Sequence, residues 1–305
     1  MSDAATWRPV VERLGLPNPM VTINRRGRVP SGPLGADYSV RTEIDDLHHI
    51  LDALGAAVEL FGWGYGGLIA LEAACERSDL RSVIAYEPVS APFAPAAIPA
   101  LRAAVNRGDL DAAVRLVNTD VSGFSTEYVA ALRESPAWAV LRPLAAPLPT
   151  ELAAIEAYRV DVRRYRALSV AVTLLLGELN ANAEPYGTAF DRIAGALPQA
   201  RIDRLPEQGH LAHAQAPHLL AATSPRRYAR ARRPKRGPGK SARPVVRRSG
   251  DTLPGGNVGQ RVTGIVAQRR SWSWGTRTVV RSSIGSMGSS RGWVLRRSDS
   301  FWRPA

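Results

Sequence analysis

The sequence predicts an α/β fold with a parallel sheet, and two observations lead to this prediction. Short apolar runs rich in β-branched residues alternate with segments whose apolar positions recur at helical spacing. A glycine-rich turn at residues 62–67 also stands directly between one such run and the helix that follows it. Alternation of strand and helix requires parallel pairing, because each helix returns the chain to the start of the next strand.

The first part of the expected core is residues 1–88. Apolar, β-branched runs predict three strands, at Met20–Asn24, Val58–Phe61 and Ser82–Tyr86. Helical spacing predicts two helices between these strands, one that begins at a Ser39 or Thr42 cap and ends at Gly55, and one over about Gly67–Glu76. Pro88 ends the third strand, so the alternation stops there.

From residue 89 to residue 168 the pattern changes to helical periodicity interrupted by prolines, with no clear strand. We expect a helical cap inserted into the core here. Strand patterns return at 170–176 and 200–205, with a helix near 190–196 between them. The core is therefore expected in two pieces, 1–88 and 169–222.

The stretch 223–305 differs in composition from the rest of the chain. Residues 224–305 contain 20 Lys and Arg and two acids, a net charge of +18, whereas the preceding residues carry a net charge of −5. Low hydrophobicity with high charge predicts a disordered basic tail. Such a tail would bind nucleic acid weakly and without sequence preference, although its composition favours a shifted reading frame.

Composition excludes several classes of protein. No run of about 18 uncharged apolar residues is present, so we expect no membrane span. The N-terminal residues carry no basic segment leading into an apolar run, which argues against a secretory signal. Cys75 is the only cysteine, so an internal disulfide is impossible and a cytoplasmic location is expected. No metal or cofactor site is expected.

Motifs in the expected core give a more specific indication. Gly62-Trp-Gly-Tyr-Gly-Gly67 follows a strand and precedes a helix, and Gln208-Gly-His210 follows the last strand. This arrangement resembles the α/β-hydrolase superfamily of bacterial serine hydrolases with a helical cap, whose nucleophile elbow is a Gly-x-Ser-x-Gly turn. The resemblance runs from residue 1 to about 222. It begins after the family's first strands and His-Gly loop, so it implies an N-terminally truncated sheet.

The resemblance assigns site residues and shows what has changed at them. Gly64 occupies the nucleophile position and has no side chain, while His210 occupies the position of the base. Asn180 stands where the acid is expected, with Glu178 as an alternative acid, and the backbone N–H of Tyr65 would be an oxyanion donor. Loss of the nucleophile, of an oxyanion donor or of the acid each costs a serine hydrolase orders of magnitude in rate. The resemblance thus implies an impaired or inactive homologue of an ester, amide or epoxide hydrolase.

Other hypotheses stay open at this point. His210 could act alone as a general base on a small substrate under the cap, or the same cavity could simply bind a small molecule. The glycines Gly62, Gly64 and Gly67 also spell a dinucleotide-binding fingerprint, with Glu87 twenty residues later at a strand end. The bulky Trp63 and Tyr65 argue against close approach of a pyrophosphate.

Overall fold

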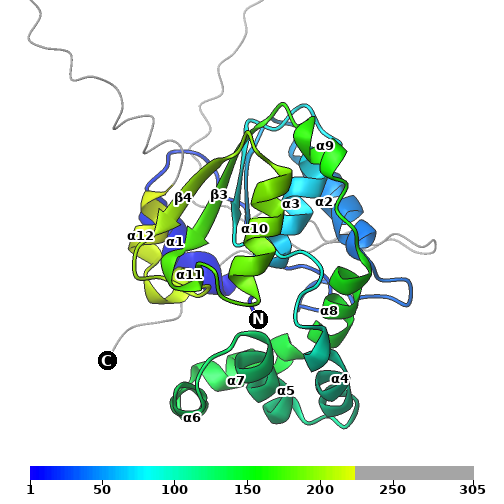
Figure 1. The fold of residues 1–305 in the computed structure, drawn as a ribbon, viewed down its shortest axis with the longest axis vertical. Coiled ribbons are helices and arrows are strands. Elements are labelled where there is room, and N and C mark those ends of the chain that lie inside the picture. Colours follow the sequence, from blue (N-terminus) through cyan, green and yellow to red (C-terminus); the bar gives the residue numbers. More distant parts are fainter. Residues whose placement is uncertain (224–305) are drawn as a thin grey trace, which may run out of the picture. The chain divides into compact units, whose positions relative to one another are not determined.

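A computed structural model describes residues 1–223, so the basic stretch from residue 224 onward, including nearly all of the expected tail, lies outside the described residues. The core is a four-stranded parallel sheet with strand order β1-β2-β3-β4 (Figure 1). The strands are β1 (Glu59–Trp63), β2 (Ser82–Tyr86), β3 (Ala171–Gly177) and β4 (Arg201–Leu205). These are four of the five strands that the sequence predicts.

Helices cover both faces of the sheet (Figure 1). Successive residues of a strand point to opposite faces, so Val83 and Ala85 join one hydrophobic cluster while Ile84 and Tyr86 join the other. The larger cluster lies under α2 (Val40–Leu54), α3 (Tyr65–Ala74) and α10 (Tyr186–Ala196). The smaller one lies under α1 (Arg8–Leu14), which follows the short helix η1 (Ala5–Trp7), and under α11 (Ala212–Gln215) and α12 (Pro217–Ala222). Both faces of the central strands are therefore apolar.

The expected caps of the first long helix are present. The Ser39 side chain accepts a hydrogen bond from the backbone N–H of Thr42, and the Thr42 side chain accepts one from the N–H of Ser39. At the other end Gly55 adopts a left-handed conformation, and its N–H donates to the last turn of α2. Both ends of α2 are thus fixed by local sequence.

The strand predicted at Met20–Asn24 is wrong, because these residues form no ladder in the structure. A strand needs a neighbour to which its backbone can bond, and β1 is the outermost strand on that side. The segment is instead held locally. The Asn24 side chain accepts a hydrogen bond from the N–H of Ala4, and the backbone carbonyl of Asn24 accepts one from the hydroxyl of Ser31.

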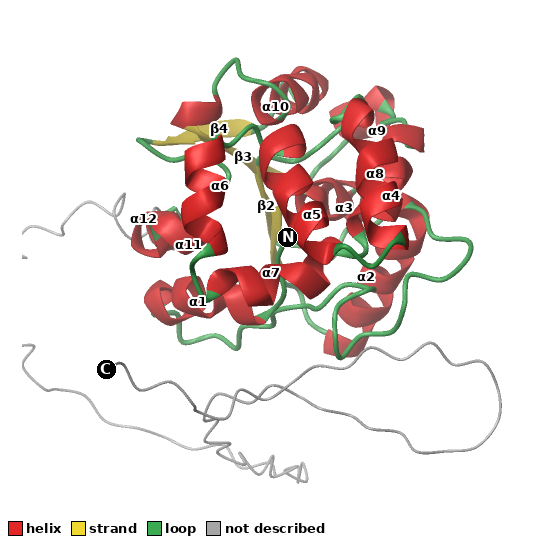
Figure 2. Ribbon diagram, turned by 90° about the horizontal axis from the view of Figure 1, so that it is seen from below, coloured by secondary structure: helices red, strands yellow, loops and turns green. Residues whose placement is uncertain are grey.

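Between β2 and β3, residues 87–170 form helices and no strand. They are η2 (Pro95–Ala97), α4 (Ile98–Asn106), α5 (Leu110–Leu116), the π-helical turn η3 (Val117–Val121), α6 (Thr126–Arg133), α7 (Ala137–Ala145), α8 (Leu148–Ala157) and α9 (Val162–Arg166). We call residues 87–170 the helical segment. Its helices α4–α8 lie beyond the carboxyl ends of the strands, and Figure 2 looks onto them from below.

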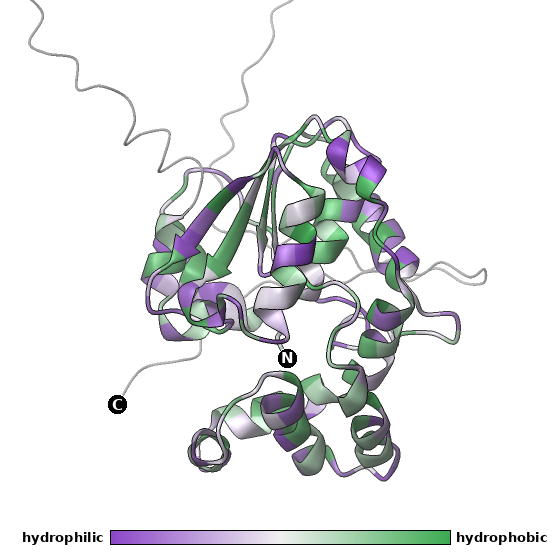
Figure 3. Cartoon of the chain, viewed as in Figure 1, coloured by the Kyte–Doolittle hydropathy of each residue, from purple (hydrophilic) through white to green (hydrophobic). Residues whose placement is uncertain are grey.

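The edge strand β4 differs from the centre of the sheet. In Figure 3 the hydrophilic colour of β4 contrasts with the apolar strands beside it. Arg201 and Arg204 of β4 are exposed, as expected of an edge strand that has to resist pairing with other chains.

Among the residues that the structure describes, no helix combines the length and the apolar character that crossing a membrane requires.

Candidate active site

The turn after β1 has the backbone geometry of an elbow. Gly64 has φ +55° and ψ −118°, a conformation that residues with a Cβ atom rarely adopt. Its N–H donates to the carbonyl of Tyr86 on β2, and its carbonyl accepts from the N–H of Gly67. The turn is therefore fixed between the sheet and the first turn of α3. Any side chain at position 64 would be directed by this fixed backbone.

The neighbouring glycines are required by packing. A Cβ atom on Gly62 would lie 2.2 Å from the carbonyl oxygen of Gly66, and one on Gly67 would lie 3.1 Å from Pro88. Close contact between β1, α3 and the end of β2 therefore explains both residues without a phosphate ligand. A Cβ atom on Gly64 would meet a different group. It would lie 3.2 Å from Cε1 and Nε2 of His210.

His210 follows β4 and is buried, with its ring held in one orientation by a carboxylate. Its Nδ1 lies 2.6 Å from Oε2 of Glu87, the residue directly after β2. A carboxylate only accepts hydrogen bonds, so Nδ1 carries the proton and Nε2 of the neutral ring is an acceptor. Burial lowers the pKa of His210 below its usual value, although Glu87 acts in the opposite direction. The neutral form is thus favoured near pH 7, as a base requires.

Glu87 is itself held firmly. It is fully buried, and its φ of +44° is a strained conformation for a residue with a side chain. The N–H of Gly177 donates to its Oε1 over 2.8 Å, and the amide of Asn180 donates to both oxygens at 3.0 Å. The strained backbone and these donors together aim the carboxylate at His210.

The sequence prediction of the acid is therefore corrected. Asn180, in the short helix η4 (Glu178–Asn180), is present at the site but contacts the acid and not His210. Glu178 accepts a hydrogen bond from the exposed N–H of Glu207 and takes no part in the contact with His210. The carboxylate comes from Glu87 at the end of β2, although β3 lies between β2 and β4 in the sheet.

Two aromatic rings enclose the imidazole of His210. Trp63 stacks on one side with ring centroids 4.4 Å apart, and Tyr186 stacks on it at 3.8 Å. The indole N–H of Trp63 also donates to the carbonyl of His210. His213 lies against the same Trp63 and stacks on Trp7. The imidazole is thus held both at its edge, by Glu87, and through its ring faces.

A buried ionic network lies beside the elbow. The Arg28 guanidinium donates two hydrogen bonds to the Glu151 carboxylate, at 2.5 Å and 3.0 Å. Arg25 forms ion pairs with both Glu151 and Glu43. The guanidinium of Arg25 also lies 4.7 Å from the ring centre of Tyr65, whose backbone N–H begins α3. Since each charge has a partner of opposite sign, the network joins the loop at 25–28 to α2 and α8.

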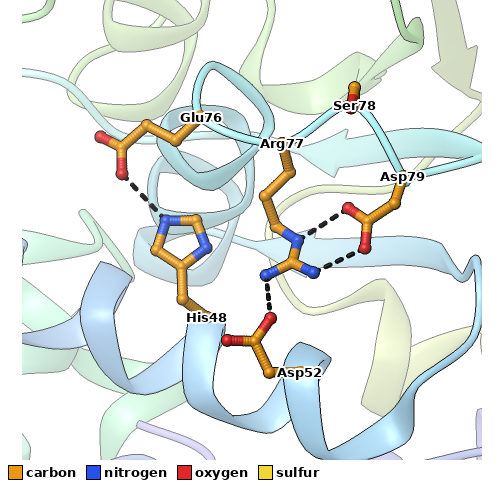
Figure 4. A pocket seen from close by; sticks show the side chains of 6 residues that line it. All are labelled: His48, Asp52, Glu76, Arg77, Ser78 and Asp79. Carbon is orange, nitrogen blue, oxygen red and sulfur yellow. Dashed lines mark hydrogen bonds and ion pairs between the residues drawn. The ribbon is translucent and has the colours of Figure 1, made fainter.

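A surface hollow of about 410 Å³ lies elsewhere, lined by residues of α2 and of the loop that follows α3 (Figure 4). Arg77 is paired there with Asp52 and Asp79, and His48 contacts Glu76. These ion pairs fasten the loop to α2, and the hollow contains neither the elbow nor His210. No group of three metal-binding side chains occurs within residues 1–223.

Comparison with known proteins places this geometry in a family. A family model described as "Alpha/beta hydrolase family" matches residues 2–223. The chain belongs to the alpha/beta hydrolase family. The turn at Gly64 lies between a strand and a helix, as the nucleophile elbow of this family does, and the helical segment follows the next strand.

Solved structures share the hydrolase fold with this chain. An alpha/beta hydrolase from Sphaerobacter thermophilus is 26% identical with a TM-score of 0.57, and the match covers 72% of this chain and 88% of that one. A thermophilic esterase from Thermogutta terrifontis is 23% identical with a TM-score of 0.54, covering 75% and 86%. An enol-lactonase from Burkholderia xenovorans is 18% identical with a TM-score of 0.55, covering 73% and 85%.

Proposed function

We propose that this alpha/beta hydrolase works without a covalent intermediate, and that His210 and Glu87 activate water directly for attack on a carbonyl group. The 2.6 Å contact between His210 Nδ1 and Glu87 carries the proposal, because it leaves Nε2 as the proton acceptor. Nε2 is directed at the space where the side chain of residue 64 is absent. A water molecule or a substrate hydroxyl in that space would meet a base in place of a serine.

The proposed reaction is a single displacement at an ester or lactone. Water gives a proton to Nε2 as its oxygen bonds to the carbonyl carbon, and His210 then returns that proton to the departing alkoxide. The N–H of Tyr65, at the positive end of α3, would stabilise the oxyanion. General-base catalysis contributes about 10²–10⁴-fold. We therefore expect slow turnover, that of an impaired relative of the serine enzymes.

We further propose that the helical segment is a cap over a small-molecule substrate. Its position beyond the carboxyl ends of the strands supports this, since ligands of open α/β sheets bind at that edge. The dinucleotide hypothesis receives no such support. Glu87 is fully buried against His210 and Asn180, and is not available for a ribose hydroxyl.

Covalent labelling tests the missing step. A fluorophosphonate probe reacts with an activated serine, so the native chain should stay unlabelled at its active site while Gly64→Ser becomes labelled. Glu87→Gln in the Gly64→Ser background should slow the labelling, because the imidazole loses its orienting carboxylate. Gly64→Ala is the matched control for the added Cβ atom. Labelling of the native chain that His210→Gln abolishes would contradict the proposal.

Hydrolysis of p-nitrophenyl acetate tests the general base. We expect steady release of nitrophenol without a burst, because no acyl-enzyme accumulates. His210→Gln should reduce the rate by roughly 10²-fold or more, to near that of the uncatalysed reaction. Equal rates for the native chain and His210→Gln would mean that the site binds ligands without catalysing hydrolysis.

A further inference from the structure

The ring of Tyr186 connects the base to the helical segment. Tyr186 is the first residue of α10 and is buried, with its ring stacked on His210 at an interplanar angle of 19°. Its hydroxyl lies 3.1 Å from the side-chain oxygen of Ser122, the residue directly after the π-helical turn η3. Phe93 of the helical segment packs edge-on against the Tyr186 ring, with the two ring centroids 5.4 Å apart. A continuous path of contacts thus runs from Ser122 to His210.

The two ends of this path belong to different parts of the fold. One end is at the sheet and the other is in the helical segment. His210 is tied to the sheet through Glu87 and Trp63. Ser122 directly follows η3, and its N–H donates to the carbonyl of Val117. A π-helical turn is a rare geometry that occurs often at functional positions. The Ser122–Tyr186 hydrogen bond is the side-chain contact by which η3 reaches the residue that covers the base.

We propose that Ser122 and Tyr186 are positioning residues that couple the helical segment to His210. While the hydrogen bond between them holds, the Tyr186 ring covers one face of the imidazole and keeps water from it. When η3 moves, as it must if a substrate enters past the helical segment, the bond breaks and the ring is free to leave His210. The catalytic meaning of this coupling rests on the proposed function, but the coupling itself is a property of the fold.

The coupling has a measurable consequence for His210. Burial is the largest influence on its pKa and lowers it, so removal of the Tyr186 ring should raise the pKa. The titratable groups that also face His210 are Glu87 at the end of β2, Tyr86 on β2, His213 on α11, Tyr186 itself and the amino group of Met1. Among these groups, Tyr186 is the hydrogen-bond partner of Ser122, so a change at Ser122 acts on His210 through Tyr186.

The test is an NMR titration of the His210 imidazole in the full chain, which requires no turnover. Tyr186→Phe keeps the ring and loses the hydroxyl, Ser122→Ala removes the other partner, and Tyr186→Ala removes the ring. We expect Tyr186→Phe and Ser122→Ala to raise the pKa of His210 by a similar amount, roughly half a unit, and Tyr186→Ala to raise it further. The Ser122→Ala/Tyr186→Phe double variant should show the shift of one single variant, because both remove the same bond.

Unchanged titration of His210 in Tyr186→Phe and Ser122→Ala would overturn the coupling, and so would additive shifts in the double variant. The two conservative variants keep the test valid if Tyr186→Ala does not fold. Absence of His210-dependent hydrolysis in the native chain, together with the expected titration shifts in the variants, would contradict the proposed function and leave the coupling intact.

Discussion

At the scale of single residues, the absence of a side chain at position 64 affects stability and chemistry in opposite directions. The left-handed φ of Gly64 is free of Cβ strain only because the residue is glycine. A serine there would supply a nucleophile but would strain the turn, and its Cβ atom would press on His210 at 3.2 Å. The glycine therefore relieves strain that a serine at this position would introduce.

Alanine substitution separates these effects. Gly64→Ala should lower the free energy of unfolding by about 1–3 kcal/mol, because a residue with a Cβ atom is held at φ +55° against His210. Gly66, two residues later, is the matched control. Nothing lies within 4 Å of a Cβ atom there and its φ is helical, so Gly66→Ala should be neutral or stabilising by up to about 1 kcal/mol. Urea denaturation of both variants decides this, and equal effects would remove the strain argument.

At the scale of elements, buried charges fasten the helical segment to the core. Burial alone would raise the pKa of Glu151 in α8, but Arg25 and Arg28 beside it lower that pKa to about 2. Arg28 is 4% exposed and Glu151 is 2% exposed, so neither charge has water as an alternative partner. The loop at 25–28 and α8 are consequently bound together as long as both charges are present.

Removal of one charge should therefore be costly. Glu151→Gln leaves two buried guanidinium groups short of a carboxylate, and we expect a loss of about 3–5 kcal/mol in unfolding free energy. Glu12→Gln is the control, because it breaks the exposed pair with Arg8 on α1 and should cost less than about 1 kcal/mol. Chemical denaturation measures both, and a small effect of Glu151→Gln would mean that the network is not buried in solution.

Local patterns in the sequence predict most elements but not how they meet. Helix α2 with its Ser39 cap and the elbow turn follow from residues close in sequence, and both are confirmed. The strand predicted at Met20–Asn24 fails because its stability depends on a neighbouring strand. The sequence pattern indicates Glu87 only as a possible ribose ligand. An acid directly after a buried strand, at the edge where the elbow and His210 end, is the signal that could have identified it.

At the scale of the whole molecule, the site depends on the strand order. The contact between Glu87 and His210 joins residues 123 positions apart, and it exists because the carboxyl ends of β1, β2, β3 and β4 form one edge. Asn180 lies at that edge and donates to Glu87, but which of several polar groups faces the imidazole depends on side-chain reach. The distances between these side chains depend on the packing of the complete sheet, so a local sequence motif does not predict them.

The pH dependence of unfolding is a property of this whole arrangement. His213 is buried between Trp7 and Trp63, and burial, with His210 adding to it, lowers its pKa to about 3. The unfolded chain, with a histidine pKa near 6.5, binds the proton more readily. The contribution of His213 is therefore fully present above about pH 6.5 and is lost as the pH falls toward 3.

Between pH 7 and pH 5 this contribution should fall by about 2 kcal/mol, since each pKa unit corresponds to about 1.4 kcal/mol. His210 has its pKa shifted in the same direction and adds to the effect. Urea denaturation at several pH values measures the slope, and His213→Phe is the control, because it keeps an aromatic ring between the tryptophans and cannot titrate. The Nδ1 atom of His213 is buried and has no hydrogen-bond partner, so this substitution strands no donor or acceptor there. If the variant and the native chain lose stability equally between pH 7 and pH 5, the neutral state of His213 is not part of what holds the fold together.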